Sequence, residues 1–510
     1  MFGVDFSEFL YILYLSFLSL TRVLIACLIS VILAIAISYI AISNRRNERL
    51  LIGILDILQS IPVLSFVPGV MLLFSKLGKI GVELSSILLI VTGTIWNIIF
   101  SYYSSLKSIP TSIRELSKVL DLGSLRKFFI VDFPYSIPQL TWNVILSFGG
   151  GWYFITYCEI FSIGELEYSV QGIGSYIMQK SASGENLYVI LGISAIIITI
   201  VFSFFLIWFP LLRFSERFRF EETAHESVSN LPLIGEKKIT EIFERLNKKL
   251  LEISQKIESY ASNRISSLIP NIIFFISVGA ILFIISYIIY EIRELSFDEL
   301  RSSVFSLFPS ILRVSIGVAI SGIIAIPLGI ALGMNKAHYA KIQSAIQIFS
   351  SLPAPAFVPL IYPILMESNI GKLVAPLLVI FLSSFWYLFY NTVAGVFSIS
   401  SDAFEVSKAL RMNLYDKLKN IVLPGASKDI FIGFLTAWGG AWNGSFVAEY
   451  LHIGEKEYYT YGIGSQISKS ASEGDVPQLL FSTLLMSSFV FITNIFVWQR
   501  LIKKSAKRIK

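Results

Sequence analysis

Long apolar segments alternate with short polar segments along almost the whole chain. A helix that spans a bilayer needs about 20 consecutive, mostly apolar residues, and eleven such segments can be placed in the 510 residues. They cover residues 20–42, 51–75, 84–106, 137–162, 187–212, 271–290, 312–334, 342–366, 373–397, 427–451 and 478–500. This pattern predicts an all-α polytopic membrane protein with about 11 transmembrane helices.

The second half of the chain repeats the first. Residues 60–68 (SIPVLSFVP) match residues 351–359 (SLPAPAFVP), and Glu115 matches Glu405. Further matched pairs are Trp96 and Trp386, Trp152 and Trp442, Glu159 and Glu449, and the segments Gly172–Ser175 and Gly462–Ser465. The agreement predicts two parallel five-helix repeats, related by an axis along the membrane normal.

Two parallel repeats of five spans require one extra crossing between them, and 271–290 supplies it. We divide the chain into a first half (1–213), a cytoplasmic amphipathic linker (214–269), a connecting span (270–296) and a second half (297–510). A structural spacer is the favoured role for the linker, ahead of binding to lipid or to a partner protein. The apolar stretches 6–20 and 297–310 are expected to be separate amphipathic helices on the outer leaflet, the second ending at Pro309.

Composition and charge agree with this interpretation. The chain is 55% hydrophobic and only 15% charged, whereas soluble domains have about 25% charged residues. Of the 41 Lys and Arg residues, 31 fall in segments that are inside if the N-terminus is outside, eight fall in outer segments, and Arg22 and Arg313 lie in or beside spans. The positive-inside rule therefore predicts a cell-membrane protein with its C-terminus in the cytoplasm. The net charge of +6 follows from this placement and does not indicate nucleic-acid binding.

The sequence offers no catalytic or metal chemistry. Cys27 and Cys158 lie in apolar runs, which favours packing over a disulfide. The three histidines form no ligand or nucleophile pattern, and no G-x-x-x-x-G-K-[ST] phosphate loop is present. We therefore predict no enzyme activity and no cofactor in this chain.

Two polar stretches, Glu115–Pro134 and Glu405–Pro424, share an outline: glutamate, then serine and lysine, then a proline nineteen residues after the glutamate. Both lie in segments predicted to be cytoplasmic. They resemble the "EAA" loop of permease subunits of binding-protein-dependent ABC importers. Ser117 and Ser407 replace the second alanine of that pattern, and Asp121 and Arg411 occupy the position of its glycine.

The resemblance implies a fused, duplicated permease with both transmembrane halves of an importer, most similar to the nitrate, sulfonate, taurine and bicarbonate branch. It implies two cytoplasmic ATPase subunits, which hold ATP and Mg²⁺, and an extracellular solute-binding protein. The stretches would each form a short helix flanked by loops and dock into one ATPase. Apolar residues available for docking are Val119, Leu122, Leu125, Phe128, Leu410, Met412, Leu414 and Leu418. The residues implied in coupling are Glu115, Ser117, Lys118, Leu122, Gly123, Leu125, Pro134, Glu405, Ser407, Lys408, Met412, Leu414 and Pro424.

Prolines, aromatic residues and charges within the spans mark a candidate solute pathway. Matched breaks in the second span of each half are the best pointer to it, although such breaks also serve packing. The candidates are Pro62, Pro68, Trp96, Trp152, Glu159, Pro353, Pro359, Trp386, Trp442, Asn443 and Glu449. For the two glutamates we favour a structural role: an ion pair of Arg22 with Glu159, and one of Arg313 with Glu449.

Two other classes remain open at this point. A secondary transporter driven by an ion gradient needs a midplane ion site and no motor, and a membrane scaffold needs no central cavity. Neither explains the duplicated stretches from glutamate to proline. The sequence does not identify the solute.

Overall fold

The computed structural model describes residues 6–59, 62–75, 77–160, 170–218, 289–453 and 456–508, together with residues 245, 249, 279, 286 and 287. Nearly all of the predicted linker and most of the predicted connecting span lie outside the described residues. The two halves can be compared throughout the remainder of the chain.

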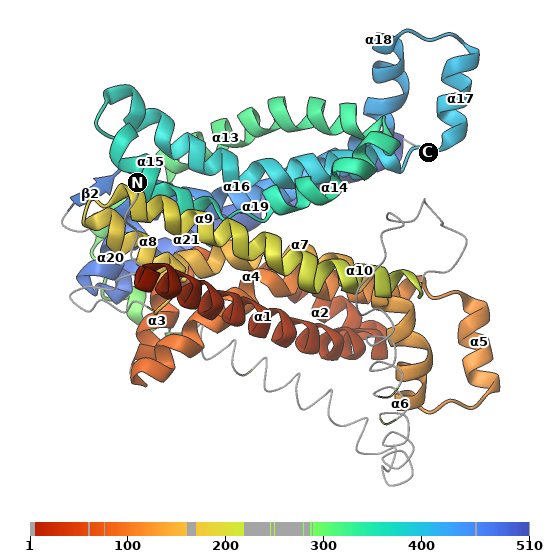
Figure 1. The fold of residues 1–510 in the computed structure, drawn as a ribbon, viewed down its shortest axis with the longest axis horizontal. Helices are drawn as coiled ribbons and strands as arrows, with labels where there is room; N and C mark the ends of the chain where they lie inside the picture. Colours follow the sequence, from red (N-terminus) through yellow and green to blue (C-terminus); the bar gives the residue numbers. More distant parts are fainter. Residues whose placement is uncertain are drawn as a thin grey trace.

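The long helices occur in the same order in both halves, whereas some of the short elements described differ between them (Figure 1). The first half consists of α1 (Phe6–Ser43), α2 (Arg45–Leu58), η1 (Val63–Phe66), α3 (Val67–Ser75), α4 (Gly78–Ser108), α5 (Thr111–Val119), α6 (Ser124–Lys127), η2 (Phe128–Asp132), α7 (Phe133–Ile160), α8 (Ile173–Ala182), α9 (Asn186–Ser203), η3 (Phe204–Trp208) and α10 (Phe209–Glu216). The second half consists of α13 (Phe297–Gly333), α14 (Lys336–Ser350), α15 (Ala354–Leu365), α16 (Asn369–Phe397), α17 (Ser401–Ala409), α18 (Leu414–Lys417), η5 (Leu418–Val422), α19 (Leu423–Glu449), β1 (Tyr450–Ile453), β2 (Lys456–Tyr459), α20 (Ile463–Glu473), α21 (Val476–Thr493), η6 (Asn494–Trp498) and α22 (Gln499–Arg508).

This architecture confirms the predicted fold class of a duplicated, helical membrane protein. Within the described residues, seven helices are long and apolar enough to cross a membrane. The total of eleven crossings stays a prediction. The strands β1 and β2 form a small antiparallel hairpin after α19, an addition that the apolar pattern did not predict.

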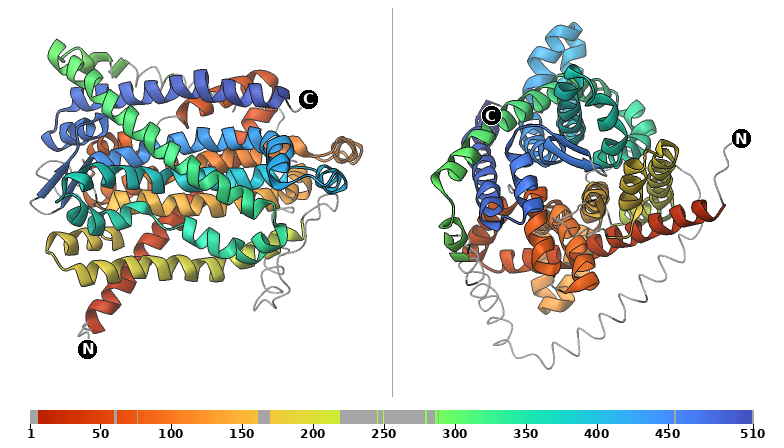
Figure 2. Two further views of the ribbon diagram at one scale, coloured as in Figure 1. Left: turned by 90° about the horizontal axis from the view of Figure 1, so that it is seen from above. Right: turned by 90° about the vertical axis from the view of Figure 1, so that its left-hand side faces the viewer.

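The predicted separate outer helices are wrong. Helix α1 runs without interruption over 38 residues and α13 over 37, and Pro309 lies inside α13 rather than at the end of a helix. At about 1.5 Å per residue each helix is roughly 55 Å long. Both helices cross the outside of the bundle obliquely (Figure 2), and this tilt accommodates a helix that is longer than the bilayer is thick.

The second span of each half is broken at a proline, as the sequence predicts. Pro62 precedes η1 and Pro353 precedes α15, both in extended conformation, because proline removes a helical hydrogen bond. Beyond each break the chain packs against the other half: α3 contacts α20 and α21, and α15 contacts α7, α8 and α9. The breaks therefore join the two halves.

Within the described residues, four π-helical turns occur at matched positions. Two of them, η2 and η5, lead into α7 and α19, and the other two, η3 and η6, lie near the end of the last helix of each half. A π turn accommodates one extra residue in a continuous helix, and such turns are frequent at functional sites. Here η2 and η5 connect the polar segments at the end of the bundle to its long helices.

Candidate functional site: two polar hairpins at one end of the bundle

The stretches singled out by the sequence form two short helical hairpins. The first polar hairpin comprises α5, a turn and α6 (residues 111–127), and the second comprises α17, a turn and α18 (residues 401–417). Both project from the same end of the bundle, where α22 also ends, and α1 begins toward the opposite end (Figure 1). The two polar hairpins thus lie at the same end of the molecule, and Figure 1 shows them on opposite sides of that end.

The turn of each polar hairpin has the same hydrogen bonds. In the first, the amide of Leu122 donates to the carbonyl of Ser117 (3.1 Å), and the amide of Asp121 donates to that of Lys118 (3.0 Å). In the second, the amide of Met412 donates to Ser407 and that of Arg411 to Lys408, both at 3.0 Å. This pairing is the Schellman motif, which ends a helix with one residue in the left-handed region.

The left-handed residues are Asp121 (φ 45°) and Arg411 (φ 49°), the two non-glycine residues with positive φ in the described part of the chain. They occupy the position of the family's glycine. Because glycine adopts positive φ without steric cost, the geometry explains the glycine of the family pattern and shows that both departures from it keep the same turn.

The serines in place of the family's second alanine also have a structural reason. Ser117 and Ser407 are buried, and each hydroxyl donates to a backbone carbonyl one turn earlier in its helix, at 2.7 Å. A small side chain is needed at this position, and a hydroxyl that bonds to its own helix introduces no unpaired polar group.

The prediction of a short helix flanked by loops is only partly right. Helices α5 and α17 are confirmed, but α6 and α18 continue through the π turns directly into α7 and α19. Pro134 and Pro424 consequently lie within a continuous helix, in the turn that follows each π turn, where each proline removes one backbone amide donor.

Exposed apolar side chains cover the outer part of both polar hairpins. In the first, Val119 is 81% exposed, and Leu116, Leu120 and Leu125 are also exposed. In the second, the exposed side chains are those of Val406, Leu410, Leu414 and Tyr415. The other predicted docking residues, Leu122, Phe128, Met412 and Leu418, are half-buried and belong to the hairpins' own packing. Solvent-exposed apolar patches with a polar rim are typical of protein–protein contacts.

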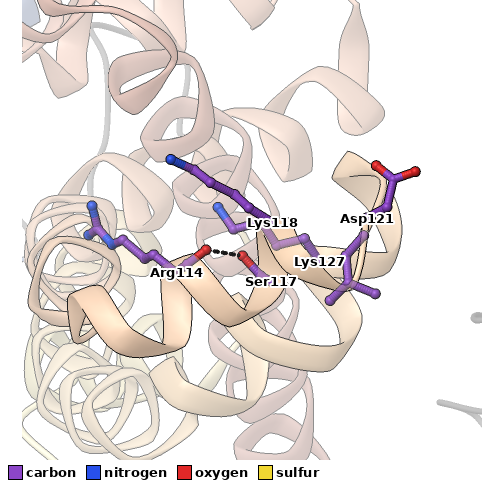
Figure 3. A pocket seen from close by; sticks show the side chains of 6 residues that line it. Arg114, Ser117, Lys118, Asp121 and Lys127 are labelled. Carbon is purple, nitrogen blue, oxygen red and sulfur yellow. Dashed lines mark hydrogen bonds between the residues drawn. The ribbon is translucent and has the colours of Figure 1, made fainter.

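The first polar hairpin encloses an open hollow of about 520 Å³, lined by Arg114, Ser117, Lys118, Asp121, Leu122 and Lys127. Figure 3 shows the nitrogen ends of Arg114, Lys118 and Lys127 gathered on one side and the carboxylate of Asp121 pointing away from them. Glu115 and Lys118 are both exposed on α5. The hollow therefore presents positive charge to solvent.

Beneath this hollow the two halves differ. In the first half the hydroxyl of Tyr39 donates to the buried carboxylate of Asp132, and Lys127 Nζ lies 3.8 Å from the same carboxylate. In the second half the matching positions hold Ile330 and Val422, which share an apolar cluster with Phe404 and Leu418. The apolar pattern does not indicate that positions 39 and 132 lie next to each other, and the Tyr39–Asp132 pair was not predicted.

The root of the first polar hairpin is held by Arg114, whose guanidinium donates to the backbone carbonyls of Leu106 (2.8 Å) and Lys107 (3.2 Å) at the end of α4. Lys107 in turn forms an ion pair with Glu48 of α2. Hydrogen bonds from Lys107 and Tyr103 lower the pKa of the Glu48 carboxyl. These bonds tie α2, α4 and α5 together.

Both predicted ion pairs are confirmed, toward the opposite end of the bundle. Arg22 Nη1 lies 3.1 Å from Glu159 Oε1, and Arg313 Nη1 lies 2.5 Å from Glu449 Oε1. Both glutamates are completely buried. Burial of a charge is tolerated when it is paired and hydrogen-bonded, and the structure therefore favours the structural role of these pairs.

Each buried glutamate also fixes the start of the next helix. Glu159 Oε2 accepts from the amide of Gly174 and Glu449 Oε2 from that of Gly464, both at 2.8 Å. Serines one turn before the arginines contribute as well: Ser19 accepts from the amide of Ile173 (3.1 Å), and Ser310 from that of Ile463 (2.9 Å). The matched glycines of the sequence thus belong to one network per half.

The two networks differ in one carboxylate. Glu83 of α4 accepts two hydrogen bonds from the guanidinium of Arg22, at 2.6 and 2.7 Å, and the matching position of the second half holds Leu373. Glu83 lies one residue before the predicted span 84–106 and was not among the predicted partners of Arg22.

The remaining pathway candidates fall into two groups. Trp152 and Trp442 are completely buried in the core, and Pro62, Pro353 and Pro359 are buried at or near the breaks. Trp96, Trp386 and Asn443 are partly exposed, and Pro68 lies in α3. Contact of any of them with solute stays a prediction.

The breaks satisfy their backbone differently in the two halves. The amide of Leu64, freed by the break after Pro62, donates to Asn443 Oδ1 of the other half at 3.1 Å. The position that matches Leu64 is Pro355, which has no amide hydrogen, and the position that matches Asn443 is Tyr153. Asn443 therefore supplies an acceptor to the half that has a free amide at Leu64, and Tyr153 occupies the matching position for the half that has no amide hydrogen at Pro355.

No group of three or more His, Cys, Asp or Glu residues that could hold a metal ion occurs in the described residues. The chain matches the family of binding-protein-dependent transport system inner membrane components over residues 16–212 and 325–508. It belongs to this family. Each half supplies one of the two matched segments, so the repeat seen in the sequence is a repeat of the family's domain.

Relatives in this family include the nitrate import permease protein NrtB of Synechocystis sp., 28% identical over 28% of this chain and 51% of the relative. The bicarbonate transport system permease protein CmpB of Synechococcus elongatus is 28% identical over 37% of this chain and 64% of the relative. The putative aliphatic sulfonates transport permease protein SsuC of Bacillus subtilis is 26% identical over 28% of this chain and 49% of the relative. These alignments span about half to two thirds of the relatives' length.

Proposed function

We propose that this chain forms the transmembrane pathway of an ATP-driven importer, with both permease halves in one polypeptide. The observation that carries the proposal is the pair of polar hairpins, which share a Schellman turn and exposed apolar side chains and project from the same end of a duplicated bundle. Membership of a family of transport components supports it further.

In this proposal each polar hairpin docks on one of two cytoplasmic ATPase subunits, which hold ATP and Mg²⁺. Closure of the ATPases draws the hairpins together, and the π turns η2 and η5 pass the movement to α7 and α19. These long helices contact α4 and α16, respectively, so their movement alters the interior of the bundle. An extracellular solute-binding protein delivers the solute at the opposite end.

The proposed solute is a small anion such as nitrate, bicarbonate or a sulfonate, because these are the solutes named for the relatives. Uptake of each anion, in labelled form, into proteoliposomes that contain the chain, its ATPase and its solute-binding protein tests this part. Equal uptake of all three, or of none, contradicts it.

The docking part is tested with one exposed apolar residue of each polar hairpin, through Val119→Asp and Leu414→Asp. Leu122 is unsuitable because it is half-buried. We expect each variant to weaken ATPase association roughly thirtyfold, as loss of an anchor of about 2 kcal/mol does. The measurement is the affinity of the purified ATPase for the chain in nanodiscs.

A matched control is Tyr459→Asp, at an exposed aromatic residue of β2. It should leave ATPase association unchanged, because β2 lies at the other end of the bundle (Figure 1). If both hairpin variants bound the ATPase as the unchanged chain does, the polar hairpins would be solvated connectors and the proposal would fail.

A further inference from the structure

The two polar hairpins can be compared with each other, residue by residue, because the chain carries both. Most positions differ between them: Arg114 corresponds to Phe404, Asp121 to Arg411 and Arg126 to Asp416. The charged residues that are the same in both are a glutamate and two lysines. They are Glu115 and Glu405, Lys118 and Lys408, and Lys127 and Lys417.

Folding of the hairpins does not explain why Lys118 and Lys408 are the same. Both side chains are exposed, and neither makes a hydrogen bond or an ion pair within the described residues. The second lysine of each pair has a different neighbour in each half: Lys127 approaches Asp132, whereas Lys417 lies over the ring of Phe404 at 5.0 Å. Both positions of each pair are therefore lysine in the two hairpins, although the residues around Lys127 and Lys417 differ.

The geometry identifies what the lysines can bind. In the first polar hairpin Lys118 comes from α5 and Lys127 from α6, and their nitrogen ends point to the same side of the hollow (Figure 3). An oxygen-rich anionic group is the natural ligand of two ammonium groups that lie on the same side of one hollow. The same polar hairpin carries the exposed side chains of Leu116, Val119, Leu120 and Leu125, as in an interface where charges border apolar anchors.

We propose that Lys118 and Lys127 in the first polar hairpin, and Lys408 and Lys417 in the second, each receive an Asp or Glu side chain of the docked ATPase. This inference rests on the proposed function and adds the chemistry of the contact. Two equal lysine pairs match a partner that presents the same carboxylate at two symmetry-related positions, which is what two copies of one ATPase do.

Charge reversal at the unpaired lysines tests the contact. Lys118→Glu and Lys408→Glu should each weaken association of the purified ATPase with the chain in nanodiscs about tenfold at low salt, and the double variant more. The loss should shrink as the salt concentration rises, because screening weakens charge contacts. Lys118→Arg should retain most of the affinity.

The matched control is Lys419→Glu, which makes the same change of charge at an exposed lysine of η5 whose counterpart is Phe129. It should change association less than threefold. If Lys419→Glu weakened binding as much as Lys118→Glu, the lysines would act only through the general field of this surface, and the proposed contact would be wrong.

Cross-linking with a zero-length carbodiimide locates the carboxylate. An amide bond between Lys118 or Lys408 and an Asp or Glu of the ATPase supports the contact, and cross-links confined to other lysines overturn it. Inorganic phosphate is the competing ligand. If phosphate bound the free chain and lost its binding in Lys118→Glu, while the ATPase bound this variant normally, the hollow would be a small-anion site and the proposal would be overturned.

Failure of this contact can be distinguished from failure of the proposed function. If Val119→Asp and Leu414→Asp abolish association while Lys118→Glu and Lys408→Glu do not, the docking proposal is supported and the lysine contact is contradicted. If none of the four affects association, the docking role of both polar hairpins falls.

Discussion

Single residues determine the shape of the polar hairpins. Asp121 and Arg411 hold positive φ angles that ordinary side chains rarely adopt, and the turn of each hairpin depends on them. Aspartate tolerates this conformation better than arginine does because its short polar side chain can bond locally. Arg411 is therefore the more costly of the two residues.

We predict that Arg411→Gly keeps the second polar hairpin and that Arg411→Val disrupts it. Glycine reaches positive φ freely, whereas a β-branched residue at φ 49° is a severe outlier. The measurement is hydrogen exchange of the amides in α17, which should stay protected in Arg411→Gly and exchange faster in Arg411→Val. Equal exchange in the two variants would contradict the role of the turn.

The ion pairs lead to a second prediction at this scale. Glu449→Gln leaves the guanidinium of Arg313 without a carboxylate among the described residues, whereas Glu159→Gln leaves Arg22 paired with Glu83. Breaking a buried pair costs about 3–5 kcal/mol. Glu449→Gln should therefore lower the apparent melting temperature of the detergent-solubilised protein more than Glu159→Gln does.

A third variant separates this explanation from a general difference between the halves. Glu83→Gln combined with Glu159→Gln removes both carboxylates of Arg22 and should destabilise the protein about as much as Glu449→Gln. If the double variant melted like Glu159→Gln alone, Glu83 would make no contribution and the asymmetry would need another cause.

At the scale of elements, the π turns connect the polar hairpins to the long helices. In η2 and η5 one extra residue is accommodated without ending the helix. The number of residues in these turns therefore sets the direction in which each hairpin faces relative to α7 or α19.

Deletion of Asn420, an exposed residue of η5, should convert the π turn into ordinary α-helix. The second polar hairpin would then be rotated by about 100° relative to α19, the angle of one residue. We expect membrane insertion to persist and solute-stimulated ATP hydrolysis in proteoliposomes to be lost. If solute still stimulated ATP hydrolysis in the deletion variant, the orientation of the hairpin would not be transmitted through η5.

For the molecule as a whole, the two ends of the bundle are chemically distinct. The polar hairpins and α22 lie at one end, and α8, α20 and the strands lie at the other (Figure 1). Cysteines introduced at Asn47 and Ser124 should be labelled only from the cytoplasm, and one at Ser183 only from outside. Labelling of the Ser124 position from outside would reverse the topology drawn from the positive residues.

The sequence predicted the features that depend on periodicity and repetition. The repeats, the breaks at Pro62 and Pro353, and both arginine–glutamate pairs follow from apolar spacing and from matched residues. Features that depend on three-dimensional neighbours were missed, such as Glu83 beside Arg22 and Tyr39 beside Asp132. The unbroken α1 was also missed, because the composition of residues 6–20 suits a surface helix and only packing shows that it continues.

The bond between Leu64 and Asn443 has a consequence for how the two halves diverged. In a transporter built from two identical chains, every substitution appears twice, so a proline that removes an amide would appear on both sides of the axis. Joining the halves in one chain frees each side to change alone. Here one side has the donor and its acceptor, and the other has Pro355 and Tyr153. The molecule therefore has two different contacts between its halves, and a substitution in one need not be matched in the other.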